Sequence, residues 1–208
     1  NAIGASAVPV NAEFRPEEIA YLVDHSDLAA VIALPCRAAS IGEALAGGDV
    51  HVPVVEVGES LPAPATGTVA ADDEAAVLYT SGTTGRPKGC MLSNTYFVRM
   101  GEWYRDLGGY CTLEPGRERL ITPLPLVHMN ALACSTMGMI QTGGCIIQLD
   151  RFHASTWWQS VRESCATCLH YLGVMPSILL NRPETPEDDI GGQIRFGFGA
   201  GVDPKHQE

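Results

Sequence analysis

Short apolar runs alternate with amphipathic segments along the chain. The apolar runs predict strands at 28–34, 52–57, 75–79, 119–122, 145–149, 167–172 and 194–198. Segments with a helical spacing of apolar residues predict helices at 15–25, 41–46, 94–107, 128–141, 155–164 and 176–181. This alternation indicates an α/β fold in which helices flank both faces of mostly parallel sheets. In such sheets, ligands bind beyond the carboxyl ends of the strands.

The first predicted helix and strand show the two patterns most clearly. Segment 15–25 carries apolar residues at Ile19, Leu22 and Val23, and acidic residues stand in its first turn, where the helix dipole favours them. Segment 28–34 is apolar throughout. Because such a run has no polar side, we expect a strand that is buried on both faces.

Turn-forming residues and the two ends of the chain bear on its domain organisation. Residues 58–68 contain two prolines and two glycines, which predict a loop, and the longer stretch 58–74 is a candidate crossing between subdomains. The first methionine is Met91, and the helix start predicted at Asp203-Pro204 lies barely one turn from the last residue. We therefore expect the chain to be a piece of a longer protein, cut at both ends.

Composition excludes several classes of protein. The chain has 208 residues, of which 46% are hydrophobic and 18% charged, so it suits a folded interior rather than disorder. Its formal net charge of −11 argues against nucleic acid or an anionic membrane surface as a partner. The best apolar stretch, 132–140, is far shorter than the roughly 18 residues of a transmembrane helix. No secretion signal is evident, and we expect a cytoplasmic protein.

Seven cysteines are scattered along the chain, at Cys36, Cys90, Cys111, Cys134, Cys145, Cys165 and Cys168. An odd number in a chain of this size indicates reduced, buried thiols. Cys165 and Cys168 stand close to His170 and resemble half of a zinc site. The sequence offers no second pair, however, and a strand at this point would send neighbouring side chains to opposite faces. We therefore interpret these residues as structural.

A segment rich in glycine and hydroxyl groups follows the strand predicted at 75–79. It reads Thr80-Ser81-Gly82-Thr83-Thr84-Gly85-Arg86-Pro87-Lys88-Gly89. The glycines allow positive φ and a close approach to a ligand, and the hydroxyl and backbone N–H groups can donate to phosphate oxygens. Lys88 adds a mobile positive charge, but the proline before it excludes a Walker loop. A solvated turn is the alternative interpretation of such a composition.

The ten-residue string resembles the signature loop of the adenylate-forming (AMP-binding) superfamily, which includes acyl-CoA synthetases, luciferases and peptide-synthetase adenylation domains. Similar segments occur in the expected order at 4–31, 123–131 and 198–201. Segments 151–158 and 174–176 are most similar to acyl-CoA ligases, and to the crotonobetaine/carnitine-CoA ligase-like branch in particular. The resemblance implies that residues 1–208 are part of the multi-subdomain N-terminal domain of such an enzyme.

Enzymes of this superfamily join a carboxylic acid to ATP, release pyrophosphate and form an acyl-adenylate, from which the thiol of coenzyme A displaces AMP. The resemblance thus implies a carboxylate–CoA ligase that uses ATP, Mg²⁺ and coenzyme A. It also implies that the glutamate that binds Mg²⁺, the ribose-binding aspartate and the adenylation lysine lie beyond residue 208. We accordingly expect the 208-residue chain to be inactive by itself.

The resemblance also assigns roles to individual positions. The β- and γ-phosphates of ATP would be held by Thr80, Ser81, Gly82, Thr83, Thr84, Gly85 and Lys88. Adenine would lie against Gly199, Ala200 and Gly201, although Gly201 departs from the alanine more common at that position. His128 would act beside the reacting carboxylate, and its alternative is a histidine that merely begins a helix. Arg151 matches a position that contacts coenzyme A phosphate in some relatives, and its alternative is a solvated surface arginine.

Two functions of other kinds remain open. The chain could be a non-catalytic nucleotide- or acyl-binding module, or part of an amino-acid-activating adenylation domain. The second would need an acidic anchor for the substrate amine, and we locate none in the sequence. The complete loop with Lys88 favours the ligase, because a site that has lost its catalytic function has no physical need for a lysine and four hydroxyls around a phosphate.

Overall fold

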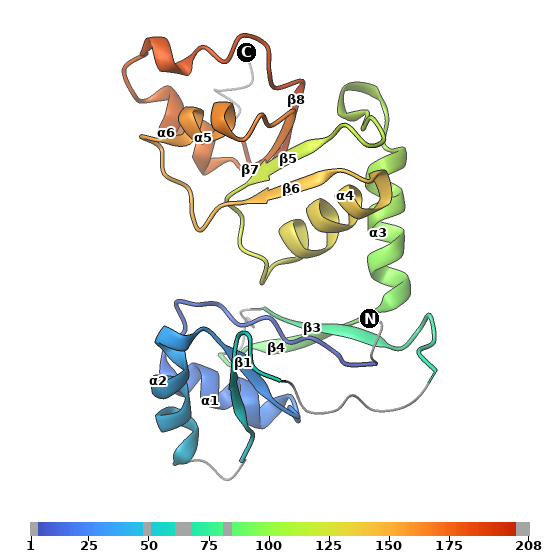
Figure 1. Ribbon diagram of the computed structural model, residues 1–208, viewed down its shortest axis with the longest axis vertical. Coiled ribbons are helices and arrows are strands. Elements are labelled where there is room, and N and C mark those ends of the chain that lie inside the picture. Colours follow the sequence, from blue (N-terminus) through green and yellow to red (C-terminus); the bar gives the residue numbers. More distant parts are fainter. Residues whose placement is uncertain (1–3, 48–50, 61–67, 81–84, 203–208) are drawn as a thin grey trace. The chain divides into compact units, whose positions relative to one another are not determined.

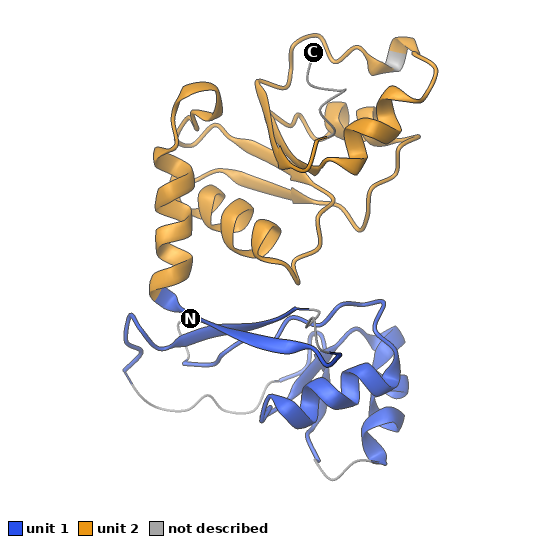
Figure 2. Ribbon diagram, turned by 180° about the vertical axis from the view of Figure 1, so that it is seen from behind, with its two compact units in different colours: residues 1–94 blue, residues 95–208 orange. Residues whose placement is uncertain are grey.

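The computed structural model describes residues 4–47, 51–60, 68–80 and 85–202. The chain divides into two compact units, residues 1–94 and residues 95–208 (Figure 2). The stretch 58–74, where we expect a crossing between subdomains, falls within the first unit, and its residues 61–67 lie outside the described part. The expected helix start at Asp203-Pro204 also lies outside it.

The first unit combines a small α/β layer with a hairpin. Its elements are α1 (Pro16–His25), β1 (Val31–Ala33), α2 (Pro35–Ala46), β2 (Val54–Glu56), β3 (Glu74–Thr80) and β4 (Lys88–Ser93). β1 and β2 pair in parallel. Ile19 and Val23 of α1 pack with Leu45 of α2 in a common core, as the helical spacing predicts. The amino end of α1 is capped by Glu18, which accepts a hydrogen bond from the backbone N–H of Arg15 at 2.8 Å.

One expectation for this unit is wrong, and one strand was not predicted. The strand predicted over 28–34 is not buried on both faces, since it spans only Val31–Ala33 and leaves Ile32 and Leu34 exposed. The strand that was not predicted is β4, which follows the glycine-rich loop and pairs antiparallel with β3 before α3 begins at Asn94. Residues 88–93 show no polar–apolar alternation, so the pattern gives no sign of this strand.

The second unit is built on one parallel sheet (Figure 1). Its elements are α3 (Asn94–Asp106), η1 (Gly109–Cys111), β5 (Arg119–Thr122), the π-helix η2 (Asn130–Ser135), α4 (Thr136–Thr142), β6 (Cys145–Gln148), α5 (Trp157–Glu163), β7 (Cys168–Leu172), α6 (Val174–Leu180), η3 (Pro186–Asp188) and β8 (Phe196–Ala200). The strands run parallel in the order β6-β5-β7-β8. The single helix predicted over 128–141 is therefore a π-helix followed by a short α-helix.

Helices cover both faces of this sheet, as the α/β prediction requires. Consecutive residues of β5 point to opposite faces, so Leu120 packs into one cluster with Tyr104 of α3, and Ile121 into another with Trp157 of α5. All four of these side chains are at most 2% exposed. Trp158, the neighbour of Trp157, is only partly buried, because adjacent helical residues cannot both face the core. The predicted fold class is confirmed.

The cysteines are free thiols, as expected, but four of the seven are exposed rather than buried: Cys36, Cys90, Cys145 and Cys165. Burial raises the pKa of Cys134 to about 11, and burial also raises the pKa of Cys168 to about 12. Cys168 belongs to a buried strand, and the residues that the structure describes contain no group of His, Cys, Asp and Glu that could hold a metal ion. No helix in the described ranges is long and apolar enough to cross a membrane.

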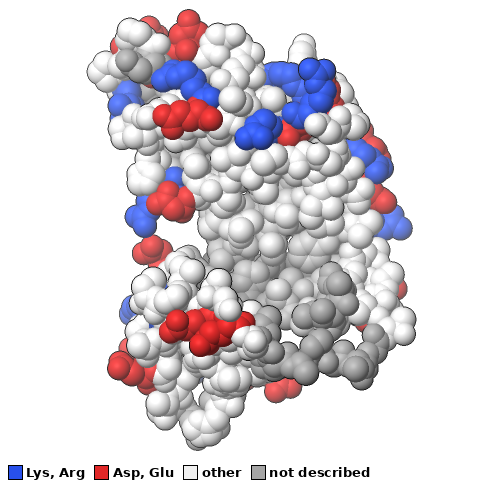
Figure 3. Space-filling model, viewed as in Figure 1, with Lys and Arg blue, Asp and Glu red and all other residues white. Residues whose placement is uncertain are grey.

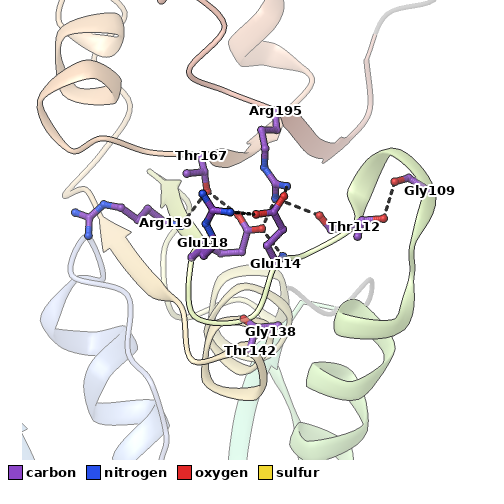
Figure 4. A network of polar contacts seen from close by, with 10 residues as sticks. Gly109, Thr112, Glu114, Glu118, Arg119, Gly138, Thr142, Thr167 and Arg195 are labelled. Carbon is purple, nitrogen blue, oxygen red and sulfur yellow. Dashed lines mark hydrogen bonds and ion pairs between the residues drawn. The ribbon is translucent and has the colours of Figure 1, made fainter.

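A buried carboxylate joins the amino ends of the strands of this sheet (Figure 4). The Glu118 side chain, just before β5, is 1% exposed and forms an ion pair with Arg195, which precedes β8. It also accepts hydrogen bonds from the Thr167 hydroxyl, just before β7, at 2.6 Å, and from the backbone N–H of Glu114 at 2.6 Å. The backbone carbonyl of Glu118 accepts from the N–H of Cys145, the first residue of β6, at 2.8 Å. One residue thus connects the starts of four strands.

Charged residues elsewhere on this unit are interspersed. On the face shown in Figure 3, basic and acidic side chains lie beside one another. Several form close pairs, among them Arg105 with Asp106 at 2.7 Å and Arg117 with Glu114 at 3.3 Å. Pairs this exposed contribute little to stability, so Glu118 and its partners are the main electrostatic feature of the unit.

We predict that Glu118→Gln lowers the free energy of unfolding by about 3 kcal/mol, because it removes the buried negative charge that pairs with Arg195 and turns an amide NH2 group towards buried donors. Urea denaturation of the purified protein measures this. Glu184→Gln, at an exposed position, is the matched control and should change stability by no more than about 0.5 kcal/mol. Equal stabilities of the two variants would contradict the structural role given to Glu118.

Candidate functional site

The candidate phosphate loop joins the two strands of the β3–β4 hairpin. Thr80, the last residue of β3, lies opposite Lys88, the first residue of β4, and both are exposed. Gly85 has a φ of +115°, a conformation that residues with a Cβ rarely adopt. Ser81, Gly82, Thr83 and Thr84 lie outside the described residues. The hairpin therefore sets Thr80 and Lys88 opposite one another at the mouth of the loop, where their side chains leave the same face of the sheet.

Lys88 differs from several of the arginines in its electrostatic surroundings. It forms no ion pair with any residue in the described part of the chain, whereas Arg105, Arg117 and Arg195 each pair with a carboxylate. No carboxylate among the described residues therefore competes with an external anion for its ammonium group. In a chain with a net charge of −11, such a group provides a local site for an anion that the protein as a whole repels.

Helix α1 holds both strands of this hairpin. On β3, the Tyr79 hydroxyl lies 2.7 Å from Nδ1 of His25 and 2.7 Å from Oγ of Ser26. On the side of β4, the Tyr21 hydroxyl donates to the carbonyl of Pro87 at 3.1 Å. The guanidinium of Arg86 lies 5.5 Å from the centre of the Tyr21 ring, within the range of a cation–π contact. These contacts fix the two ends of the loop, on either side of residues 81–84, which lie outside the described part of the chain.

In the second unit, the remaining candidates follow the carboxyl ends of strands. His128 follows β5, Arg151 follows β6, and Gly199 and Ala200 end β8, with Gly201 directly after them. Because these strands are parallel members of one sheet, their carboxyl ends share one edge (Figure 1). That edge is where ligands of open α/β sheets bind. The sheet thus gathers residues that are up to 73 positions apart in the sequence.

His128 stands at the start of the helical segment that returns from this edge. Its side chain is exposed. Its backbone N–H donates to the carbonyl of Pro125 at 3.2 Å, and its own carbonyl accepts from the N–H of Leu132 at 3.0 Å. The backbone is therefore satisfied within the turn, and the imidazole is left open to solvent and to a ligand.

The turn at 199–201 is shaped by close backbone packing. A Cβ on Gly199 would lie 2.5 Å from the carbonyl oxygen of Tyr171, so β8 can lie beside β7 only because this residue is glycine. Gly201 has a φ of +74°, and the carbonyl of Ala200 accepts from the N–H of Gly173 at 2.8 Å. The glycines therefore have a structural reason in addition to the adenine contact that the resemblance implies.

Arg151 lies on the surface beyond β6. Its Nε lies 3.5 Å from Oδ2 of Asp150, and both side chains are more than half exposed. The pKa of Asp150 is lowered, first by the hydrogen bond from the backbone of Arg151 and then by that from His153. Such an exposed pair is compatible with a coenzyme A phosphate contact and equally with a solvated arginine.

The sequence analysis missed one polar cluster, which is centred on His170 of β7. The His170 side chain is fully buried, and its Nε2 lies 2.6 Å from the hydroxyl of Tyr104. Its Nδ1 lies 2.7 Å from Oγ of Ser135 and 3.2 Å from Oδ1 of Asn130. Burial lowers the pKa of His170 to about 3, so the ring is neutral at physiological pH. A histidine in an otherwise apolar strand was the only sequence signal for this cluster.

Comparison with protein families identifies what this arrangement resembles. The family model for the AMP-binding enzyme matches residues 1–208, the whole chain. A sulfoacetate–CoA ligase from Cupriavidus necator is 33% identical over 219 residues, covering 99% of this chain and 42% of that protein. A crotonobetaine/carnitine–CoA ligase from Salmonella typhi is 27% identical over 212 residues, covering 89% of this chain and 39% of that protein. The chain thus spans less than half the length of these relatives.

A solved structure supports the fold. The N-terminal domain of FACL13 from Mycobacterium tuberculosis superposes with a TM-score of 0.79 at 22% sequence identity. The match covers 98% of this chain and 52% of that domain. At this level of identity the likeness shows the fold alone.

The buried His170 predicts a dependence of stability on acid pH. The pKa of His170 is about 3 in the folded protein and about 6.5 in an unfolded chain, so between these pH values the unfolded state binds the additional proton. The contribution of the buried His170 to the free energy of unfolding is fully present above pH 6.5. It is lost as the pH falls towards 3, at up to about 1.4 kcal/mol per pH unit. Urea denaturation at several pH values measures the slope, which should be shallower in His170→Gln by about this amount. The same slope in both proteins would contradict the assignment.

Proposed function

The chain belongs to the AMP-binding enzyme family, and on this premise we propose that its parent protein is an AMP-forming carboxylate–CoA ligase. In the first step, a carboxylate oxygen of the acid attacks the α-phosphorus of ATP, and pyrophosphate leaves with the bond electrons. In the second, the sulfur of coenzyme A attacks the acyl carbon, the thiol loses its proton, and AMP leaves. The acid becomes reactive because AMP is a far better leaving group than the oxygen of a carboxylate. Relatives named as CoA ligases support this class of reaction.

The hairpin is the single observation that carries the proposal. It places Thr80 opposite Lys88, which forms no ion pair with any residue that the structure describes, and α1 contacts the hairpin on both sides. Negative charge moves onto pyrophosphate as the P–O bond breaks, so a positioned cation and hydroxyl donors stabilise the transition state more than the ground state. We assign the β- and γ-phosphates to Thr80, Gly85 and Lys88 together with residues 81–84.

The carboxyl edge of the second unit supplies the other proposed contacts. Gly199, Ala200 and Gly201 present backbone with little side chain, which suits the flat face of adenine. The exposed imidazole of His128 suits a group beside the reacting carboxylate, where it can donate a hydrogen bond. Arg151 is a candidate for a phosphate of coenzyme A. Mg²⁺ would neutralise charge on the phosphates, and we assign its ligand to the parent protein beyond residue 208.

The two alternatives make different demands on the residues of the site. A non-catalytic nucleotide-binding module would bind ATP without needing the lysine for turnover. An amino-acid-activating domain would need a carboxylate placed to hold the substrate amine. The match to relatives named as CoA ligases, and the available ammonium of Lys88, favour the acid–thiol ligase.

We predict that Lys88→Ala in the parent protein lowers kcat/KM for ATP about 100-fold, since it removes one preorganised donor from the developing negative charge. Acid-dependent exchange of labelled pyrophosphate into ATP measures this step. Arg182→Ala removes an equal charge from an exposed position and should leave the rate within about twofold. An unchanged rate in Lys88→Ala would remove the hairpin from the mechanism and favour the non-catalytic module.

We also predict that the 208-residue chain releases no pyrophosphate from ATP, whatever acid is offered. The chain covers 42% of the sulfoacetate–CoA ligase, and the proposed mechanism needs a metal ligand and a lysine that we assign outside it. A coupled pyrophosphate assay with a panel of carboxylic acids tests this. Turnover by the chain would show that residues 1–208 contain the complete machinery.

A further inference from the structure

The cluster around His170 connects three elements of the second unit. The ring lies on β7, Tyr104 belongs to α3, and Ser135 and Asn130 are the two ends of the π-helix η2. Both ring nitrogens have partners within 2.7 Å, although the side chain is fully buried. A buried polar group with both sites satisfied is stable and holds its partners in one arrangement.

The partners determine where the ring proton lies. Asn130 Oδ1 can only accept, so Nδ1 of His170, 3.2 Å away, carries the proton. The hydroxyl of Ser135 accepts from Nδ1 and donates to the backbone carbonyl of Asn130 at 3.1 Å. Nε2 then has a free lone pair and accepts from the hydroxyl of Tyr104 at 2.6 Å. The neutral ring with its proton on Nδ1 satisfies every one of these bonds.

The Nδ1 side of the ring acts on the turn that follows β5. A π-helix is wider than an α-helix, and such turns need extra stabilisation and often occur at functional sites. Here Ser135 joins the carbonyl of Asn130 to His170, so the ring holds both ends of the turn against β7. Asn130 is only two residues from His128, and the backbone of Leu132 binds that of His128. The Nε2 atom, in contrast, is hydrogen-bonded to Tyr104 of α3.

We propose that His170 is a positioning residue for the acid-activating step: its Nδ1–H holds the π-helix η2, and with it His128 and Asn130, at the carboxyl edge of the sheet. The proposal rests on the proposed function, since that function places His128 beside the reacting carboxylate. His170 itself is buried and touches no substrate. Its contribution is to restrict the directions in which His128 and Asn130 can face.

Two conservative substitutions separate this role from simple packing. The side-chain nitrogen of Asn can occupy the position of Nδ1, and that of Gln the position of Nε2. His170→Asn should therefore keep the donor to Ser135 and Asn130 and lose the contact with Tyr104, whereas His170→Gln should do the reverse. Asn is one methylene shorter than Gln and leaves the larger gap in this buried site, so a loss of packing alone would impair His170→Asn more than His170→Gln, which is the opposite of the order expected here.

In the full-length protein, we expect His170→Gln to raise KM for the acid or lower kcat by about tenfold in pyrophosphate exchange, because a shift of about 1 Å in a reacting geometry can cost up to 100-fold. KM for ATP should stay unchanged. His170→Asn should retain activity within about threefold of the natural protein. Tyr104→Phe should behave like His170→Asn, and Ser135→Ala like His170→Gln. Equal losses in His170→Asn and His170→Gln, in proportion to their stabilities, would overturn the proposal.

Hydrogen exchange gives a readout that does not depend on activity. In His170→Gln and Ser135→Ala, the backbone amides of residues 130–136 should exchange at least tenfold faster than in His170→Asn. Unchanged exchange at these amides would refute the positioning role even if catalysis were impaired. If the natural protein showed no acid-dependent pyrophosphate exchange while the amides responded as expected, the proposed function would fail and the role of His170 in holding η2 would stand.

Discussion

A carboxylate buried at the amino ends of parallel strands governs the second unit. Removing Glu118 from water is costly, and the cost is offset only where several donors converge on it. Thr167, Arg195 and the backbone of Glu114 meet that requirement, and each is tied to the start of a strand or to the segment leading into one. Strands held together at their amino ends and running in one direction also end together. The common carboxyl edge, where the candidate ligand contacts lie, follows from this constraint.

Local pattern was enough to predict the α/β fold, because each strand of the parallel sheet is a short apolar run and each covering helix has an apolar face. It was not enough for β4, since residues 88–93 mix lysine, glycine and serine with apolar residues and pair only through the hairpin. Nor could it place the buried clusters. Glu118 and Arg195 are 77 residues apart, and His170 and Tyr104 are 66 apart, so no local spacing connects them. Their partners become evident only once the sheet has formed.

In the candidate site, too, the sequence revealed what lies in consecutive residues and missed what comes together only in the fold. The signature loop was identified from the sequence because its function resides in consecutive residues, whose backbone and hydroxyl groups act together. The contacts that hold the loop were not, because Tyr21, His25 and Ser26 come from an ordinary amphipathic helix and the residue that caps its carboxyl end. His128 was recognised by its surroundings in the sequence, whereas the residue that supports it, His170, was considered only beside the nearby cysteines.

The two polar clusters of the second unit solve different physical problems. Glu118 is charged, and its network needs a guanidinium and hydrogen-bond donors, which suits a place where strands must be tied together without movement. His170 is neutral and both donates and accepts, so it can join a hydroxyl on one side to a hydroxyl and an amide on the other without a counter-ion. A neutral clamp near the carboxyl edge adds no charge to a region proposed to bind two anions, an acid and a nucleotide. A charged residue in its place would shift the electrostatic potential felt by both. The use of histidine at this buried position is therefore consistent with holding a turn in place beside anionic substrates while leaving their recognition to exposed groups.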